Sequence, residues 1–203
     1  MYFLTDYADD VVYLGRCKFK VNPAFDVILR IQRLFREEKI DDELKTVQAL
    51  KMLVKNRFKL KLLTFKEKQD LLNLVFKDCV NTKTRPPTRQ KTAVLDFDYD
   101  AEYIYASFLL DYNIDLTEAC GRLSWRKFIA LFEGLSERTK IREVMRIRSM
   151  EIPQYNGHNQ NQIQEIQELK SYYALPVRGG GGQQGLNALF STLERMAVNN
   201  CRN

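Results

Sequence analysis

The sequence predicts a mostly α-helical fold: a multi-helix domain with a small N-terminal β-hairpin and a flexibly tethered C-terminal helix. Apolar residues recur at three- and four-residue spacing along most of the chain, which is the helical period. The segment before residue 22 alternates as a strand does. Four consecutive glycines, 179–182, precede the last amphipathic stretch and are typical of a flexible hinge. At 203 residues, 45% of them hydrophobic, the chain can bury one sizeable core.

The hairpin is expected from two short apolar segments, 11–14 and 17–21, in the second of which apolar residues alternate with lysines. Between them lies Gly15-Arg16, a pair suited to a two-residue turn with glycine first. Asn22-Pro23 then offers an N-cap and a first-turn proline. A helix is therefore expected over residues 23–37.

A second helix is expected over residues 42–57. The alternating segment 58–62 fits either a short strand or a frayed helix end, and the pattern does not decide between them. Thr64 followed by Glu67 is a capping-box pattern, so a third helix should begin there. Its expected inward stripe has the i, i+3, i+4, i+7 spacing and consists of Leu72, Val75, Phe76 and Cys79.

A polar, basic segment with a double proline, 83–95, is predicted to be a linker, because paired prolines block helix continuation. It divides a basic hairpin-plus-helices region, 1–82, from an acid–aromatic helical block, 96–153. We expect that block to pack on residues 1–82 as one compact unit. The remaining residues, 154–203, are expected to form a variable tail.

The acid–aromatic block begins with a stretch, 101–112, that is apolar nearly all round, which predicts a helix buried on most sides. Ser124 is expected to cap a second helix whose face consists of Trp125, Phe128, Ile129 and Phe132. Ser136 is expected to cap a third helix that ends at Ile152-Pro153.

The tail holds a short predicted helix, 163–173, and then the glycine run. Beyond the glycines, an apolar stripe at helical spacing is a candidate partner-binding surface. Its residues are Leu186, Leu189, Phe190, Leu193 and Met196. Such a tethered helix either folds back on its own domain or docks on another molecule, and the pattern leaves both readings open.

Charge is distributed unevenly along the chain. Residues 1–95 carry a net charge of +8, and residues 96–203 a net charge of −2. This asymmetry predicts a charged assembly surface, through which one half attracts the other within a molecule or between copies. Its candidate residues are Asp96, Asp98, Asp100, Arg138, Arg142 and Arg146. The arginines, at i, i+4, i+8, also fit a solvated helix face or a phosphate grip.

No catalytic, cofactor or metal site is expected. The three alternate aspartates resemble a calcium loop, but the glycine and glutamate that such a loop needs are replaced by Ala101 and Ser107. At a helix N-terminus these acids would instead be favoured by the helix dipole. The four cysteines are scattered, and His158 is the only histidine. No long apolar run or signal sequence occurs, so we expect a cytoplasmic protein that does not enter the membrane.

Two blocks, 96–118 and 123–135, resemble the phage gene-product-fifteen family, which is encoded in the tail-morphogenesis region of long-tailed phages and prophages of Gram-positive bacteria. The likeness covers roughly residues 1–153. Family members often carry two adjacent aromatics where this chain has Ser124-Trp125, a difference that concerns packing. The tail from about residue 156 shows no such likeness.

The resemblance implies a non-enzymatic tail-assembly chaperone that keeps the tape-measure protein, or other tail proteins, soluble in the cytoplasm of the bacterial host. An alternative is a structural virion component, in the tail or connector, that self-assembles as a homo-oligomer. A third reading is a nucleic-acid-binding protein, because lysines and arginines gather between Lys51 and Lys68. That reading is disfavoured because the aromatics sit at core spacing.

Overall fold

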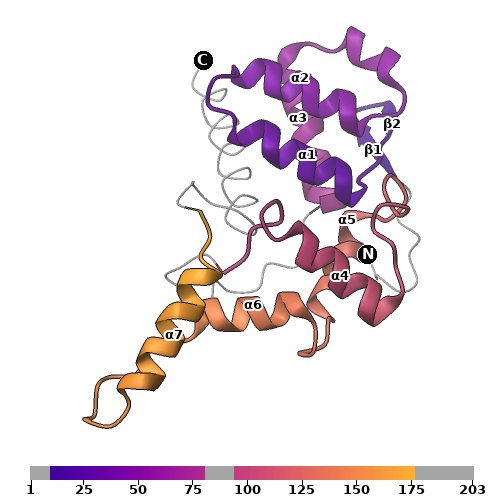
Figure 1. Cartoon of the computed structure of the whole chain (residues 1–203). Helices are drawn as coiled ribbons and strands as arrows, with labels where there is room; N and C mark the ends of the chain where they lie inside the picture. The colour runs from indigo at the N-terminus through magenta and orange to yellow at the C-terminus, as the bar shows by residue number, and fades with distance from the viewer. Residues whose placement is uncertain (1–9, 81–93, 177–203) are drawn as a thin grey trace. The chain divides into compact units, whose positions relative to one another are not determined.

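The computed structural model describes residues 10–80 and 94–176 (Figure 1). These residues form two compact units. Among these residues, the first unit comprises 10–80 and 119–130, and the second 94–118 and 131–176. The boundary falls within helix α5 (Trp125–Glu133). The predicted linker 83–95 lies almost wholly outside the described residues. So do the glycine hinge and the apolar stripe from Leu186 to Met196. The packing of 96–153 on 1–82 stays a prediction.

The N-terminal hairpin is confirmed. Strands β1 (Val11–Leu14) and β2 (Cys17–Lys20) pair antiparallel, with Leu14 opposite Cys17 across the turn. Gly15 has a φ of +57°, and Arg16 keeps a negative φ, as the glycine-first turn requires. Val12 and Phe19 are buried, so one face of the hairpin covers the core of the first unit.

Helix α1 (Phe25–Arg36) begins two residues later than the Asn22-Pro23 pattern predicts, and the expected Asn22 cap is wrong. The N-cap position is Ala24, which makes no side-chain capping bond. Residues 22–24 are instead held extended by the chain around them. The Asn22 N–H donates to the Leu53 carbonyl at 2.7 Å, and the Pro23 carbonyl accepts from the Trp125 N–H at 2.7 Å.

Helix α2 (Asp42–Leu53) ends before residue 57 because Val54 forms an isolated β-bridge with Val21. The ambiguous segment is a short 3-10 helix, η1 (Arg57–Leu62). Helix α3 (Phe65–Val75) starts at the predicted capping box, in which the Thr64 hydroxyl accepts from the Glu67 N–H and the Glu67 carboxylate accepts from the Thr64 N–H. A π-helical turn, η2 (Phe76–Val80), extends α3.

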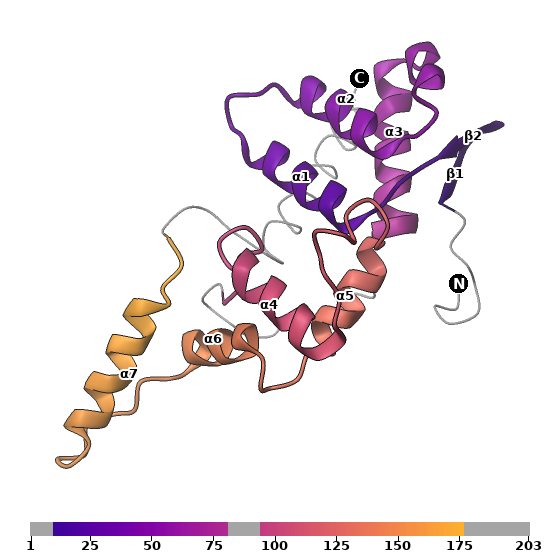
Figure 2. The same ribbon diagram turned by 45° about the vertical axis from the view of Figure 1, so that its right-hand side comes forward.

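In the first unit, helices α1, α2 and α3 lie side by side, and α3 also contacts β1 (Figures 1 and 2). The start of α5 contributes an aromatic cluster to this core. The Phe128 ring stacks on Phe25 with centroids 4.9 Å apart and on Trp125 at 5.6 Å. The aliphatic part of the core includes Ile28, Ile31, Leu50, Leu53, Leu71, Leu72 and Val75.

The second unit is built on helix α6 (Lys140–Ser149), which contacts both α4 (Ala101–Tyr112) and α7 (Gln160–Tyr172). A hydrogen bond joins α4 to the start of α6, where the Ser107 hydroxyl accepts from the Ile141 N–H at 3.3 Å. Ser136 does not cap α6 as predicted. Thr139 holds the N-cap position, and Ser136 bonds instead to the Asp111 carboxylate.

The prediction that α4 is buried on most sides is wrong. Ile104, Ser107 and Phe108 are buried, but Leu109 and Leu110 on the other side are 42% and 69% exposed. Within the described part of the chain, none of the helices combines the length and the apolar character that crossing a membrane requires.

Candidate interaction surfaces

A buried ion pair fixes the start of α4 to the end of α6. The Arg148 guanidinium donates two hydrogen bonds, each of 2.7 Å, to the two carboxylate oxygens of Asp100. It also donates to the carbonyls of Tyr173 at 2.6 Å and Val94 at 3.0 Å. The two side chains are 5% and 0% exposed. Asp100 therefore does not belong to a charged surface, which corrects the sequence prediction.

Sequence reasoning did not single out Arg148, although a signal for it exists. Ile141, Val144 and Arg148 follow the i, i+3, i+7 spacing of the buried face of α6. An arginine on an otherwise apolar stripe needs a buried partner, because an unpaired buried charge is costly. The arginines that the sequence predicted for the surface are Arg138, Arg142 and Arg146, and none of them follows this spacing.

The other charged residues of the predicted surface are of two kinds: some make local structural hydrogen bonds, and the others are exposed. Asp96 accepts from the backbone N–H of Asp98 at 2.8 Å and so shapes the turn before α4. Arg142 donates to the carbonyls of Leu135 and Glu133 at the C-terminal end of α5, where a cation offsets the helix dipole. Arg138 precedes α6 instead of lying on it, so the predicted helical row of arginines is wrong. Arg138 and Arg146 are exposed.

The C-terminal end of α7 is anchored to α6. Lys170 Nζ donates to the carbonyls of Arg148 and Met150, both at 2.7 Å. The Tyr173 carbonyl accepts from Arg148, and its ring meets the Tyr103 ring edge-on at 6.3 Å. Hydrogen bonds to Tyr173 and Glu143 raise the pKa of Lys140, whose ammonium lies over the Tyr173 ring at 5.0 Å. These contacts gather on the last turn of α7.

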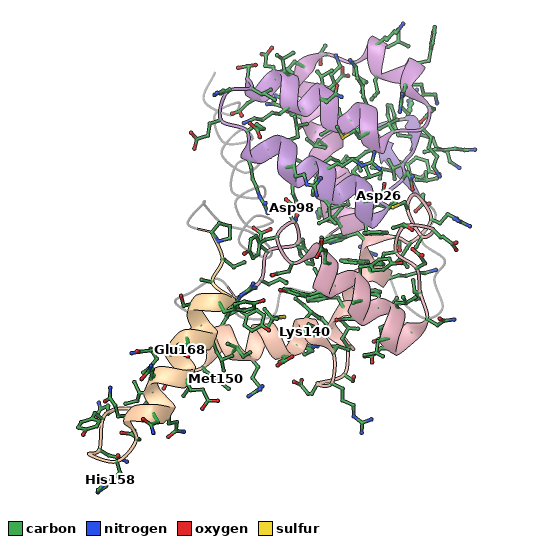
Figure 3. All side chains as sticks on the ribbon, viewed as in Figure 1. Asp26, Asp98, Lys140, Met150, His158 and Glu168 are labelled. Atoms are coloured by element: carbon green, nitrogen blue, oxygen red, sulfur yellow. The ribbon has the colours of Figure 1, made fainter. Side chains whose placement is uncertain are left out.

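Toward its N-terminus α7 extends away from α6, and His158 marks the loop that precedes it (Figures 1 and 3). None of its residues is buried, although the helix carries large apolar side chains. Ile163 and Ile166 are half-buried, Leu169 is 38% exposed and Tyr172 is 76% exposed. A helix of 13 residues without a buried face gains little from packing, and most helices in proteins depend on such packing.

The outer side of α4 carries an acidic–apolar face, which we define as Glu102, Ala106, Leu109 and Leu110. These residues follow the i, i+4, i+7, i+8 spacing of one helix side, and all four are exposed. Residues 96–118 contain no lysine or arginine and seven acids, of which Asp100 is buried in its ion pair.

The first unit carries a lysine–aromatic surface on η1 and β2, which we define as Lys18, Arg57, Phe58, Lys61 and Leu62. Phe58 and Leu62 are 79% and 81% exposed, and the Lys61 ammonium lies over the Phe58 ring at 5.3 Å. Residues 44–66 contain no acid. The expectation that the aromatics lie at core positions is therefore wrong for Phe58.

Hydrogen bonds attach η1 to the hairpin and hold this surface in place. The Asn56 side-chain oxygen accepts from the Lys20 N–H at 3.0 Å, and its amide nitrogen donates to the Lys18 carbonyl at 3.3 Å. Lys59 Nζ donates to the same carbonyl at 3.1 Å. Lys59 is therefore a structural residue, while Arg57 and Lys61 are exposed.

No three His, Cys, Asp or Glu residues within 10–80 and 94–176 gather closely enough to hold a metal ion. His158 is exposed in the loop before α7. Cys17 and Cys120 are exposed, while Cys79 is partly covered within η2. Burial raises the pKa of the Cys79 thiol to about 11.

The cysteines should therefore differ in reactivity. At pH 8 we expect iodoacetamide to modify the exposed Cys17 about 100-fold faster than Cys79, because only the thiolate reacts and a pKa near 11 leaves little of it at Cys79. The rate at Cys79 should rise as the pH is raised toward 11. A time course followed by peptide mass spectrometry measures each rate, and urea should abolish the difference. Equal rates in the folded chain would contradict the burial of Cys79.

Most of the chain is similar to one family of known proteins. A family model described as "Bacteriophage Gp15 protein" matches residues 8–175. The match includes the hairpin and continues through α7, so it reaches past residue 153, where the likeness read from the sequence ended. No curated protein and no solved structure matches the chain.

Proposed function

Because this chain belongs to the bacteriophage Gp15 protein family, we propose that it is a non-enzymatic tail-morphogenesis protein that acts as an assembly chaperone for the tape-measure protein. The observation that carries the proposal is α7, a helix with large apolar side chains that its own unit leaves unburied. A tape-measure protein is a long helical client whose apolar stripes aggregate unless they are covered.

α7 suits this task because, among the described residues, its hydrogen bonds to α6 lie at its C-terminal end. Its C-terminal end is held by Lys170 and Tyr173, while Ile163 and Ile166 belong to its first two turns. A client helix laid against them would complete the burial that α7 lacks, in the way that amphipathic helices pair through i, i+3, i+4 anchors. Full burial of an isoleucine contributes about 1.5–3 kcal/mol. The apolar stripe from Leu186 to Met196, outside the described residues, is a second candidate contact.

The test is co-expression of the chain with the tape-measure protein from the same gene cluster. Replacing Ile163 and Ile166 by aspartate should reduce the soluble, co-purified client at least about tenfold, because two apolar anchors are lost. The matched control replaces Gln162 and Gln167 by aspartate, which adds the same charge to exposed positions of α7. The control should keep the client soluble.

Three outcomes separate the alternatives. A client that stays insoluble with the wild-type chain rules out the chaperone role. A client that is solubilised equally by the isoleucine and glutamine variants leaves the role standing but excludes α7 as its contact, and deletion of residues 179–203 then tests the C-terminal stripe. Stoichiometric presence of the chain in purified phage particles would favour a structural component, since a chaperone leaves before maturation.

A further inference from the structure

Helix α4 has two apolar sides, of which its own unit covers one. Phe108 and Ile104 face the core, and Phe108 is fully buried. Leu109 and Leu110 lie beside Ala106 on the acidic–apolar face, where they form a contiguous stripe and not isolated exposed residues. A helix that is apolar all round is normally buried all round, so the second stripe indicates a missing partner.

The lysine–aromatic surface has the complementary composition. It offers Phe58 and Leu62 as exposed apolar groups, and Lys18, Arg57 and Lys61 as exposed cations, of which Lys61 lies over the Phe58 ring. The acidic–apolar face offers leucines with Glu102 and a surrounding segment devoid of cations. Apolar groups on both surfaces, accompanied by charges of opposite sign, are the composition of a specific protein interface.

We propose that copies of this chain associate head to tail, with the acidic–apolar face of one copy seated on the lysine–aromatic surface of the next. Pairing each face with itself would bring acid against acid or lysine against lysine, so a two-fold symmetric contact through either face is disfavoured. Each copy therefore uses both faces, and repetition builds a ring or an open filament.

A nucleic acid is the competing occupant of the lysine–aromatic surface. Cations and the Phe58 ring would suit a single strand, since bases stack on exposed aromatics between basic side chains. Leu62, which is 81% exposed, provides no stacking surface for a base but matches the leucines of α4. Composition therefore favours a second copy.

The test uses two variants of the full chain that each destroy one face. Leu110→Arg places a cation in the acidic–apolar face, and Phe58→Glu places an anion in the lysine–aromatic surface. Both positions are exposed, so neither change opens a cavity. Sedimentation velocity after nuclease treatment measures association across protein concentration. Leu44→Arg, at another exposed leucine, is the matched control.

We expect the wild type and the control to form oligomers that grow with concentration and weaken as salt is raised. Each variant alone should show at least a tenfold higher dissociation constant. An equimolar mixture of the two variants should form a dimer and stop there, because one intact face of each kind remains. A wild-type chain that stays monomeric, a mixture that does not dimerise, or oligomers that vanish on nuclease treatment would each overturn the proposal.

Discussion

Replacing Arg148 by methionine is expected to lower the free energy of unfolding of the second unit by about 3–5 kcal/mol. The change leaves the Asp100 carboxylate buried without its cation and removes the donor to the carbonyls of Val94 and Tyr173. Three segments lose their common contact: the turn before α4, the end of α6 and the end of α7. Urea denaturation followed by far-UV circular dichroism measures the loss.

The controls distinguish the effect of breaking the ion pair from the effect of removing an arginine from α6. Arg146→Met, on the same helix but exposed, should change stability by no more than about 0.5 kcal/mol. Asp100→Leu combined with Arg148→Met removes both charges and should cost less than the sum of the single changes. Hydrogen exchange in peptides from α4 and α6 locates the effect. Equal losses at Arg146 and Arg148 would show that the pair does not organise the second unit.

The ion pair illustrates what the sequence could not predict. Asp100 and Arg148 are 48 positions apart, and no local rule couples them. Local rules did predict the hairpin turn at Gly15 and the capping box at Thr64, because each motif contains all of its own hydrogen-bond partners. They failed at Asn22, which is held extended by a segment about 30 residues later.

Hydrophobic periodicity has a related limit. It identifies which side chains of α4 are apolar, but the number of neighbours available to cover them is decided by the tertiary fold. The pattern therefore predicts that Leu110 is a core residue, whereas the structure exposes it. The prediction fails in the same way for Phe58, which lies exposed on a short 3-10 helix. Both candidate interaction surfaces therefore contain apolar residues that the pattern predicts to be buried and that are exposed in the structure.

Phe128 should give the other large loss of stability. Its side chain is 1% exposed and stacks between Phe25 and Trp125, so Phe128→Ala is expected to cost about 3–5 kcal/mol through lost burial and the cavity left behind. Phe128→Leu keeps most of the volume and should cost clearly less. Trp125 is the only tryptophan of the chain, so its fluorescence reports unfolding of this cluster directly.

The reason for so large an effect is topological. Residues 119–130 join a unit whose other described residues are 10–80, and the extended pairing of Pro23 with Trp125 brings the two segments together. The aromatic stack is what holds the start of α5 to the start of α1 once that pairing is made. Lys127→Ala, at the exposed neighbouring position, should leave the unfolding midpoint almost unchanged. If Phe128→Ala cost no more than Lys127→Ala, the first unit would fold without residues 119–130, and the stack would be a consequence of the fold and not one of its supports.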